Sequence, residues 1–292
     1  MRYIGSVYRP PSESRSFILQ CTVGCSHNRC TFCSMYKDKK FYIRTIDEIL
    51  EDIDSAKAYF GNVSKVFLAD GDALCMKTEE LLTIIDRLYM VFSGLNHVGI
   101  YASPNSILEK TVEELCALKE HGLTIAYLGV ETGDPELLHD IQKGVTCEEM
   151  IQAGRKIRET GILLSATIIL GLAGRTPLAL PHAVHTGKIL SAMNPDYIGA
   201  LTLMMEQGTP LYRRAQKGEF VLPAPFEILD ELKIILENCE LNGTEFRSNH
   251  ASNYLPIKGR FPEDKTKMVQ LIDHIIQSGD HSYLRPDYLR AL

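Results

Sequence analysis

Four of the eight cysteines in this 292-residue chain lie close together, between positions 21 and 33. Soft thiolates at short spacing in a loop suit zinc or an iron–sulfur cluster. Four thiolates can close a tetrahedral zinc site, whereas three on a four-iron cluster leave one iron open for chemistry. Cys21 falls at the end of an apolar run or in the turn after it. The segment therefore predicts a metal centre, and both kinds of centre remain open at this point.

The remaining cysteines are isolated along the chain. In a large chain without an apolar secretion signal, metal binding is favoured over disulfides, and an isolated cysteine is expected to be a small buried hydrophobe. These residues are Cys75, Cys116, Cys147 and Cys239.

The elements that must position the cysteine segment are short apolar runs that alternate with amphipathic stretches. Nearly continuous apolar character is typical of parallel strands covered on both faces. The amphipathic stretches predict helices, and three of them open with a Thr and a Glu at the spacing of a capping box. The predicted strands span residues 16–20, 65–68, 97–101, 124–130, 163–170 and 197–204, and the boxes are Thr45/Glu48, Thr111/Glu114 and Thr146/Glu149.

Six strand–helix units thus occupy residues 16–205, an alternation that implies a parallel sheet with right-handed crossovers. An eight-unit barrel takes about 250 residues, so we expect a partial (βα)6 parallel barrel, with a doubly wound sheet as the alternative. The expected domains are a barrel with its lead-in over residues 1–210 and a C-terminal helical and loop extension over 211–292. Helices are predicted near 225–242 and 264–278 in that extension.

The cysteine segment resembles that of the radical S-adenosylmethionine (SAM) superfamily. Members carry Cys-x3-Cys-x2-Cys after the first barrel strand, with an aromatic residue just before the last Cys, and this chain has Gly24-Cys25 and then Cys30-Thr-Phe32-Cys33. One departure is that four residues, not three, separate Cys25 from Cys30. The resemblance implies that Cys25, Cys30 and Cys33 bind a 4Fe–4S cluster and that Phe32 packs beside it.

Further segments resemble the SAM-binding landmarks of this superfamily, and each follows a predicted strand. After the second strand, Asp70-Gly71-Asp72 stands where members have a Gly-Gly-Glu sequence whose backbone carbonyls bind the SAM amino group. After the fourth, the stretch that ends in Glu131 is similar to the coproporphyrinogen-dehydrogenase-like and elongator-like branches. Lys143 then matches a basic residue for the SAM carboxylate, and Ser103 follows the third strand.

The fifth and sixth strands complete the resemblance. Thr167 and the backbone near Leu170 match a stretch that contacts the ribose and adenine, and residues 206–211 are similar to a Pro-Gly-Thr-Pro-Leu sequence in which Gln207 replaces the first Pro. Sites at the carboxyl ends of strands are also what a barrel leads one to expect.

The resemblance implies reductive cleavage of SAM to methionine and a 5′-deoxyadenosyl radical, which abstracts hydrogen from a substrate. The expected cofactors are a 4Fe–4S cluster and SAM. The expected partners are a small-molecule or unknown substrate and a low-potential electron donor such as flavodoxin or ferredoxin. The protein thus supplies positioning and excludes water, while the cofactors carry the chemistry.

A polar loop at residues 246–254 offers candidates for the substrate site. It is dense in hydrogen-bonding side chains, and His250, Asn253 and Tyr254 suit substrate binding or proton transfer. We expect this loop to cover the barrel mouth; an ordinary connecting loop would look the same.

Composition limits the alternatives. A net charge of −6 disfavours nucleic acid, and no basic appended module supports RNA modification. No stretch approaches the ~20 apolar residues that span a bilayer, and the first residues lack a signal-peptide core, so we expect a cytoplasmic protein with no membrane association. The runner-up functions are anaerobic porphyrin or heme chemistry and, in another class, a non-catalytic iron–sulfur or zinc protein.

Overall fold

The computed structural model describes residues 2–291, which divide into two compact units. The first unit takes in the chain up to Asn28, then Met35–Leu128 and Gln152–Leu164. The second takes in Arg29–Ser34, Gly129–Ile151 and the chain from Ser165 onward. The cysteine segment is therefore shared, since Cys25 belongs to the first unit and the other two candidate ligands belong to the second.

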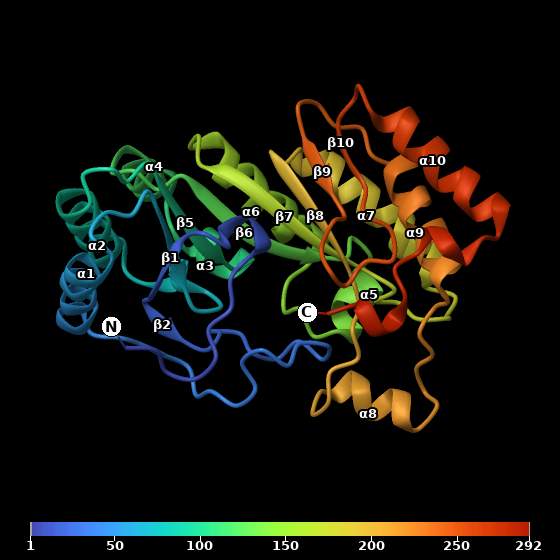
Figure 1. Ribbon diagram of the computed structural model, residues 1–292, viewed down its shortest axis with the longest axis horizontal. Coiled ribbons are helices and arrows are strands. Elements are labelled where there is room, and N and C mark those ends of the chain that lie inside the picture. The colour runs from blue at the N-terminus through green and yellow to red at the C-terminus, as the bar shows by residue number, and fades with distance from the viewer. Residues whose placement is uncertain (1, 292) are drawn as a thin grey trace. The chain divides into compact units, whose positions relative to one another are not determined.

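The first unit is built on parallel strands in the order β1-β4-β5-β6 (Figure 1). Each is largely buried, as continuous apolar runs predict. A separate antiparallel ribbon, β2 with β3, follows β1 directly and carries the chain to the cysteine loop. The strands are β1 (Phe17–Gln20), β2 (Thr22–Val23), β3 (Tyr42–Ile43), β4 (Lys65–Ala69), β5 (His97–Ala102) and β6 (Ile125–Glu131).

The helices of this unit begin where their sequences supply caps. The three predicted capping boxes form, two of them in this unit and the Thr146/Glu149 box in the part of α6 that belongs to the second unit. In each, the Thr hydroxyl accepts from the Glu amide and the Glu carboxylate accepts from the Thr amide. Helices α1 and α2 pack side by side (Figure 1). The helices are α1 (Ile46–Phe60), α2 (Thr78–Val91), α3 (Pro104–Glu109), α4 (Val112–Glu120) and the second half of α6 (Cys147–Glu159), with short 3-10 turns η1 (Pro11–Glu13) and η2 (Ala73–Cys75).

The second unit has its strands in the order β7-β8-β9-β10, with β10 antiparallel to β9. Helix α9 packs against both α7 and α10 (Figure 1). The strands are β7 (Leu163–Leu170), β8 (Tyr197–Thr202), β9 (Glu245–Arg247) and β10 (Lys258–Arg260). The helices are α5 (Pro135–Asp140), α7 (Ala179–Met193), α8 (Pro210–Gln216), α9 (Pro225–Glu237), α10 (Lys265–Ser278), η3 (His281–Tyr283) and η4 (Asp287–Leu289).

All six predicted strands are confirmed, as β1, β4, β5, β6, β7 and β8, and they alternate with helices as a (βα) architecture requires. The predicted end of the helix after residue 225 is wrong. It stops at Glu237, where the Asn238 side chain donates to the Ile234 carbonyl. Strands β9 and β10 lie where only a loop was expected, because three-residue strands carry no readable alternation.

A buried carboxylate ties the N-terminal segment to the strands of the first unit. Glu13, at the end of η1, accepts hydrogen bonds from Tyr127 (2.5 Å), from His97 (2.7 Å) and from the Ser16 hydroxyl. Burial alone would raise the pKa of Glu13, but these hydrogen bonds outweigh it and hold the pKa below its usual value. An added Cβ at Gly99 would lie 2.9 Å from the same carboxylate, so a glycine is needed there.

Candidate active site

The first candidate ligand, Cys25, lies in a loop that is shaped by its neighbour. Gly24 has φ +79°, a conformation that favours glycine, and its amide and carbonyl both bond to the segment after β4. The Cys25 side chain is half-buried. Cys21, by contrast, is fully buried, and burial raises the pKa of its thiol to about 12. These environments separate a thiol that is accessible to a ligand from one that is held protonated in the core.

Asp70 joins the segment after β4 to the cysteine loop. Its Oδ2 accepts from Lys39 Nζ (2.7 Å), Gly24 N (3.1 Å) and Gln20 Nε2 (3.2 Å). Its own amide donates to the Thr22 hydroxyl at 3.1 Å. Both side chains of the Lys39–Asp70 ion pair are almost completely buried. The carboxylate is thus a structural tie through Oδ2, while its buried Oδ1 has no hydrogen-bond partner among the described residues.

Gly71 is the point where this segment comes closest to the cysteine. An added Cβ would lie 2.9 Å from Cys25 Cβ and 2.6 Å from the Tyr36 ring, too near for any other residue. The Gly71 amide donates to the Gly24 carbonyl at 3.1 Å. The backbone after β4 therefore runs directly against the loop that carries Cys25.

Asp72 connects the same segment to the end of β5. Its Oδ1 accepts from the Ser103 amide (2.9 Å) and the Ser106 hydroxyl (2.7 Å), and its Oδ2 accepts from the Ser26 hydroxyl. The Ser103 hydroxyl caps α3 by accepting from the Ser106 amide. The candidates Asp72 and Ser103 are thus brought together with the cysteine loop, through bonds within the protein.

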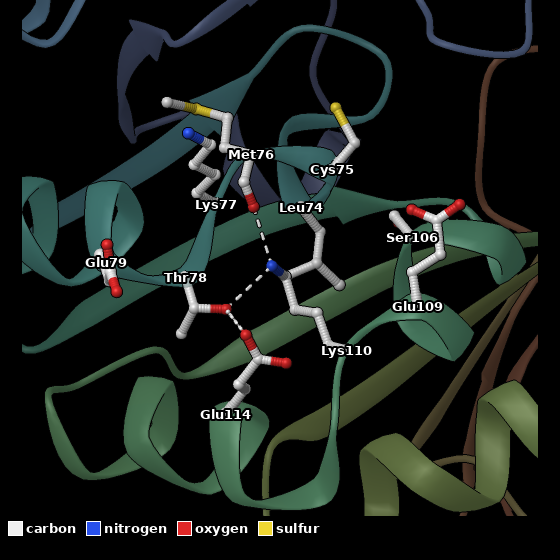
Figure 2. Close-up of a pocket in the computed structure, with 10 residues that line it drawn as sticks. All are labelled: Leu74, Cys75, Met76, Lys77, Thr78, Glu79, Ser106, Glu109, Lys110 and Glu114. Carbon is white, nitrogen blue, oxygen red and sulfur yellow. Dashed lines mark hydrogen bonds between the residues drawn. The ribbon is translucent and has the colours of Figure 1, made fainter.

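A cavity of about 340 Å³ lies next to this segment. Figure 2 shows the buried Lys110 amine between the Met76 carbonyl (2.8 Å) and the Thr78 hydroxyl (3.1 Å), with Thr78 donating to Glu114 (2.7 Å). Burial, followed by the charge of Asp72, raises the pKa of the Cys75 thiol to about 12. Cys75 is therefore held as a neutral thiol. It is only half-buried, as are Cys116 and Cys147, so among the four isolated cysteines the expected burial holds for Cys239 alone.

In the second unit, the Cys30–Cys33 turn is fastened by its backbone. The Thr31 amide donates to the Ile141 carbonyl (2.9 Å), and the Thr31 carbonyl accepts from the Leu211 amide (3.0 Å). Both cysteines are half-buried. Phe32 packs against a buried apolar cluster made of Leu137, Ile141, Leu172, Ala173, Leu203, Leu211 and Phe220.

Glu131 and Lys143 form an ion pair at the carboxyl end of β6. Glu131 has φ +65°, which is rare for a residue with a side chain. Its Oε1 accepts from Lys143 Nζ at 2.9 Å, and both side chains are about one-tenth exposed. An added Cβ at Gly129 would lie 2.1 Å from Glu131 Oε1. Glu131 and Lys143 thus pair in space that is free because residue 129 has no side chain.

Thr167 and Leu170 lie on opposite faces of β7. Thr167 is half-exposed and is in register with Gly199 of β8, whereas Leu170 is buried. The Leu170 carbonyl accepts from the Leu203 amide at 2.9 Å. Thr167 thus presents a hydroxyl on the accessible face, while the Leu170 carbonyl is already used within the protein.

The candidate loop after β9 is attached to the carboxyl half of β8. Asn253 is buried and donates to the Ala200 carbonyl (2.7 Å), and its Oδ1 accepts from the Thr202 hydroxyl (2.9 Å). The Tyr254 hydroxyl donates to Asp287 at 3.0 Å. His250 Nδ1 lies 2.9 Å from the Ser252 hydroxyl, and its pKa is lowered by burial and by the charge of Arg285.

The candidate ligands of an iron–sulfur cluster are the three half-buried cysteines of this segment. Within residues 2–291, no three His, Cys, Asp or Glu side chains already gather around one point in the arrangement of a metal site. The donor chemistry nevertheless fits, because three half-buried cysteines follow the first strand and the Gly71 backbone packs against one of them. Thiolates are the ligands that such clusters use.

The comparison with protein families decides the identity. Residues 19–185, more than half of the chain, match the model of the Radical SAM superfamily. The chain belongs to the radical SAM superfamily. The cofactors of this superfamily are a 4Fe–4S cluster and SAM, as predicted, and its members are generally enzymes.

Curated relatives lie within the same superfamily. The heme chaperone HemW of Bacillus subtilis is 25% identical over 231 residues, which cover 75% of this chain and 58% of HemW. The ribosomal protein uS12 methylthiotransferase RimO of Trichormus variabilis is 24% identical over 238 residues, or 77% of this chain and 49% of RimO. The chain spans about half the length of these relatives.

Solved structures share the fold. Coproporphyrinogen III oxidase (HemN) from Escherichia coli, a radical SAM enzyme, gives a TM-score of 0.56 at 19% identity, covering 76% of this chain and 51% of that one. The radical SAM methyltransferase TsrM from Kitasatospora setae, with cobalamin and a [4Fe–4S] cluster bound, gives 0.56 at 20% identity, covering 72% and 41%. These likenesses confirm the predicted partial-barrel class. No helix among the described residues is long and apolar enough to cross a membrane.

Sequence reasoning missed the residues that hold the candidates in place. Lys39 pairs with Asp70, which is 31 positions away in the sequence. His182 contacts the turn after β6 and Glu231 the turn after β7, and these two residues, 49 positions apart, also contact each other. An isolated Lys, His or Glu on a helix or loop carries no local signal of such a contact. Only the apolar neighbours of His182 in α7 indicated that it would be buried.

Proposed function

We propose that this chain is a radical SAM enzyme in which Cys25, Cys30 and Cys33 hold the 4Fe–4S cluster. When bound, the cluster supplies the electron that cleaves SAM reductively and yields the radical that acts on a substrate. The substrate class stays open, and members of the superfamily typically act on small molecules. Cys21 has no ligand role in this proposal, because its thiol is buried and protonated.

The observation that carries the proposal is the contact between Gly71 and the cysteine loop. A backbone segment that follows β4 and lies against Cys25 can offer carbonyl oxygens to the amino group of SAM beside the cluster. Asp70 and Asp72 do not bind the cofactor directly in this proposal. They fix that backbone through buried hydrogen bonds to Gly24 and Ser103.

The residues of the second unit bind the remainder of SAM. Lys143 offers a cation for the carboxylate, and its pairing with Glu131 keeps it in place until the ligand arrives. The Thr167 hydroxyl on the accessible face of β7 suits a ribose hydroxyl. Both kinds of contact need groups that are already fixed in position before the ligand binds.

The C-terminal extension, residues 211–292, covers the site in this proposal. Its loop is bonded to the carboxyl half of β8 through Asn253 and Ser252. His250, whose lowered pKa keeps it neutral near pH 7, and Tyr254 are the candidates for binding substrate or moving a proton. A low-potential donor such as flavodoxin or ferredoxin would supply the electron.

The test is anaerobic reconstitution followed by reduction with dithionite in the presence of SAM. The proposal expects about four irons and four sulfides per chain and release of 5′-deoxyadenosine. Lys143→Met should raise the KM for SAM and leave the iron content unchanged. A chain that binds one zinc instead, or that binds a cluster and never cleaves SAM with any substrate class tried, would favour the non-catalytic alternative.

A second candidate is a role in heme or porphyrin chemistry, favoured by the likeness to HemW over 75% of this chain. HemW is described as a heme chaperone, and this chain spans 58% of its length. Titration of the reconstituted protein with hemin, followed by the Soret band, tests this candidate. Saturable binding at micromolar concentration supports this candidate. A Soret band that does not differ from that of hemin in buffer alone rejects it.

A further inference from the structure

His182 is a completely buried histidine whose two ring nitrogens contact different parts of the second unit. It lies in the first turn of α7. Nδ1 is 2.7 Å from the Thr132 hydroxyl, and Nε2 is 3.1 Å from Glu231 Oε1 of α9. A buried imidazole with both nitrogens engaged is fixed in orientation, because any rotation would leave a polar atom unsatisfied.

Of the two groups that His182 contacts, Thr132 lies in the turn after β6, and Glu231, in α9, bonds the turn after β7. Thr132 immediately follows Glu131, and its hydroxyl also accepts from the Asp134 amide at 3.0 Å. Glu231 Oε1 accepts from the amide of Gly171, which immediately follows Leu170, at 2.7 Å. His182 and Glu231 together therefore connect the residue after Glu131 with the residue after Leu170.

The hydrogen bonds are compatible with a neutral imidazole that carries its proton on Nε2. A carboxylate only accepts, so the ring carries its proton on Nε2 and donates it to Glu231. Nδ1 is then an acceptor, and the Thr132 hydroxyl donates to it while accepting from Asp134. Every polar atom in the chain from Asp134 to Gly171 is satisfied with the imidazole neutral.

We propose that His182 is a positioning residue that sets the backbone of both turns, and thereby Glu131 and the carboxyl end of β7, before SAM binds. This inference rests on the proposed SAM-binding roles of Glu131, through its pair with Lys143, and of β7. It assigns His182 no contact with SAM or substrate, because the side chain is fully buried. Glu231 has the same role from α9, through Gly171.

A matched control lies one turn further along the same helix. His185 bonds Asp134 Oδ2 through Nδ1 at 2.8 Å, so it contacts the turn after β6. No bond links it to Gly171 or Glu231 among those the structure shows for residues 2–291. A substitution at His185 therefore disturbs one turn, whereas a substitution at His182 disturbs the connection between two.

The test uses amide hydrogen exchange of the cofactor-free chain, with Asp134 and Gly171 as reporters of the two turns. His182→Asn keeps an acceptor near the Nδ1 position, and His182→Gln keeps a donor near Nε2. We expect His182→Asn to speed exchange of Gly171 by about tenfold and to spare Asp134, and His182→Gln to do the reverse. His185→Phe should affect Asp134 alone. Equal effects of both His182 variants on both amides, or no effect, would overturn the proposal.

The second measurement separates positioning from general support of the fold. In the reconstituted protein, both His182 variants should raise the KM for SAM about tenfold, with iron content and kcat within twofold of the parent. Glu231→Gln should raise the KM less, since its amide oxygen can still accept from Gly171. A lowered melting temperature with an unchanged KM would reduce His182 to a structural residue and refute the inference. If the parent itself cleaves no SAM, the proposed function fails, while the exchange data still decide whether His182 connects the turns.

Discussion

Two strand faces of this molecule, one in each unit, differ in what covers them. In the first unit, an aromatic face on β4, β5 and β6 is formed by Phe67, Tyr101 and Tyr127, whose ring centroids are 4.8–6.2 Å apart. Gly99 is in register with Phe67 on this face. Glu13 of the N-terminal segment lies against this face and accepts from Tyr127. The chain itself therefore fills this face.

In the second unit, alternate residues of β7 and β8 stay half-exposed. Thr167 pairs in register with Gly199, and Ile169 with Leu201, on a half-exposed face whose opposite side is fully buried. Ile169 packs against the same apolar cluster as Phe32, so the open part of this face is around Thr167. A filled face serves stability, because its contacts exist without a ligand. An open face with a hydroxyl on it has room for one. The contrast predicts that substitutions on the filled face act on stability, whereas those on the open face act on SAM binding.

The largest expected effect tests the three candidate ligands of the cluster. Cys25→Ala, in the first unit, and Cys30→Ala or Cys33→Ala, in the second, should each abolish the broad absorbance of the reconstituted cluster and most of its iron. Cys21→Ala should retain both, because a thiol with a pKa raised to about 12 is not a thiolate near neutral pH. Loss of the cluster in Cys21→Ala with retention in Cys25→Ala would reverse the assignment.

The next effect concerns the buried ion pair of the first unit. Lys39→Met leaves the Asp70 carboxylate buried without its cation, which should lower the free energy of unfolding by about 3–5 kcal/mol. Chemical denaturation of the cofactor-free chain measures it. Arg87→Met, which removes an exposed pair with Asp54, is the control and should cost about 0–1 kcal/mol. Similar costs for the two variants would contradict the view that this unit depends on its buried charges.

The aromatic face provides an intermediate effect. Glu13→Gln replaces a buried acceptor of three side-chain hydrogen bonds with an amide that is partly mismatched to them, and we expect a loss of about 1–3 kcal/mol. The KM for SAM should not change at a temperature where the variant is folded. A raised KM without a loss of stability would show that this face contributes to SAM binding and not only to stability.

The open face gives the converse result. Thr167→Val keeps the shape and removes the hydroxyl from a half-exposed position, so the free energy of unfolding should change by no more than about 0.5 kcal/mol. The KM for SAM should rise roughly tenfold, about 1.4 kcal/mol, if the hydroxyl bonds the ribose. Steady-state formation of 5′-deoxyadenosine measures it, with Ser165→Ala on the same face as the control.

The smallest effect is a pH dependence at the loop after β9. His250 has a lowered pKa in the folded chain because of burial and Arg285, so the unfolded chain, with a pKa near 6.5, binds protons first as the pH falls. The contribution of His250 to stability is complete above about pH 6.5 and is lost as the pH falls through the lowered value. His250→Gln should flatten this part of the stability profile. An unchanged profile would mean that His250 is not buried in solution.

The strands and the helix starts could be predicted because their signals are local. The apolar run at 163–170 forms β7, and Thr45 caps α1 with its own Glu48. The short segments could not, since β9 has three residues and α5 has six. A pattern of period 2 or 3.6 needs more residues than that to be recognised.

For the candidate site, the sequence predicts which residues lie near the cofactors but not how their side chains are oriented. The cysteine spacing and the residues after the strands indicate where a cofactor binds, and Glu131 with Lys143 does form a pair. Whether a carboxylate faces a ligand or the protein depends on residues far away in sequence. Asp70 and Asp72 turned inward because Lys39 and the amide of Ser103 lie within reach.

The close contact between the Glu131 side chain and Gly129 predicts how these positions vary among related sequences. An oxygen of the Glu131 carboxylate occupies the space that a Cβ at position 129 would take, 2.1 Å away. A side chain at position 129 would require the end of the Glu131 side chain to move, and Lys143 Nζ lies only 3.1 Å from the same point. We therefore expect relatives with a side chain at position 129 to differ more often at position 131 or 143.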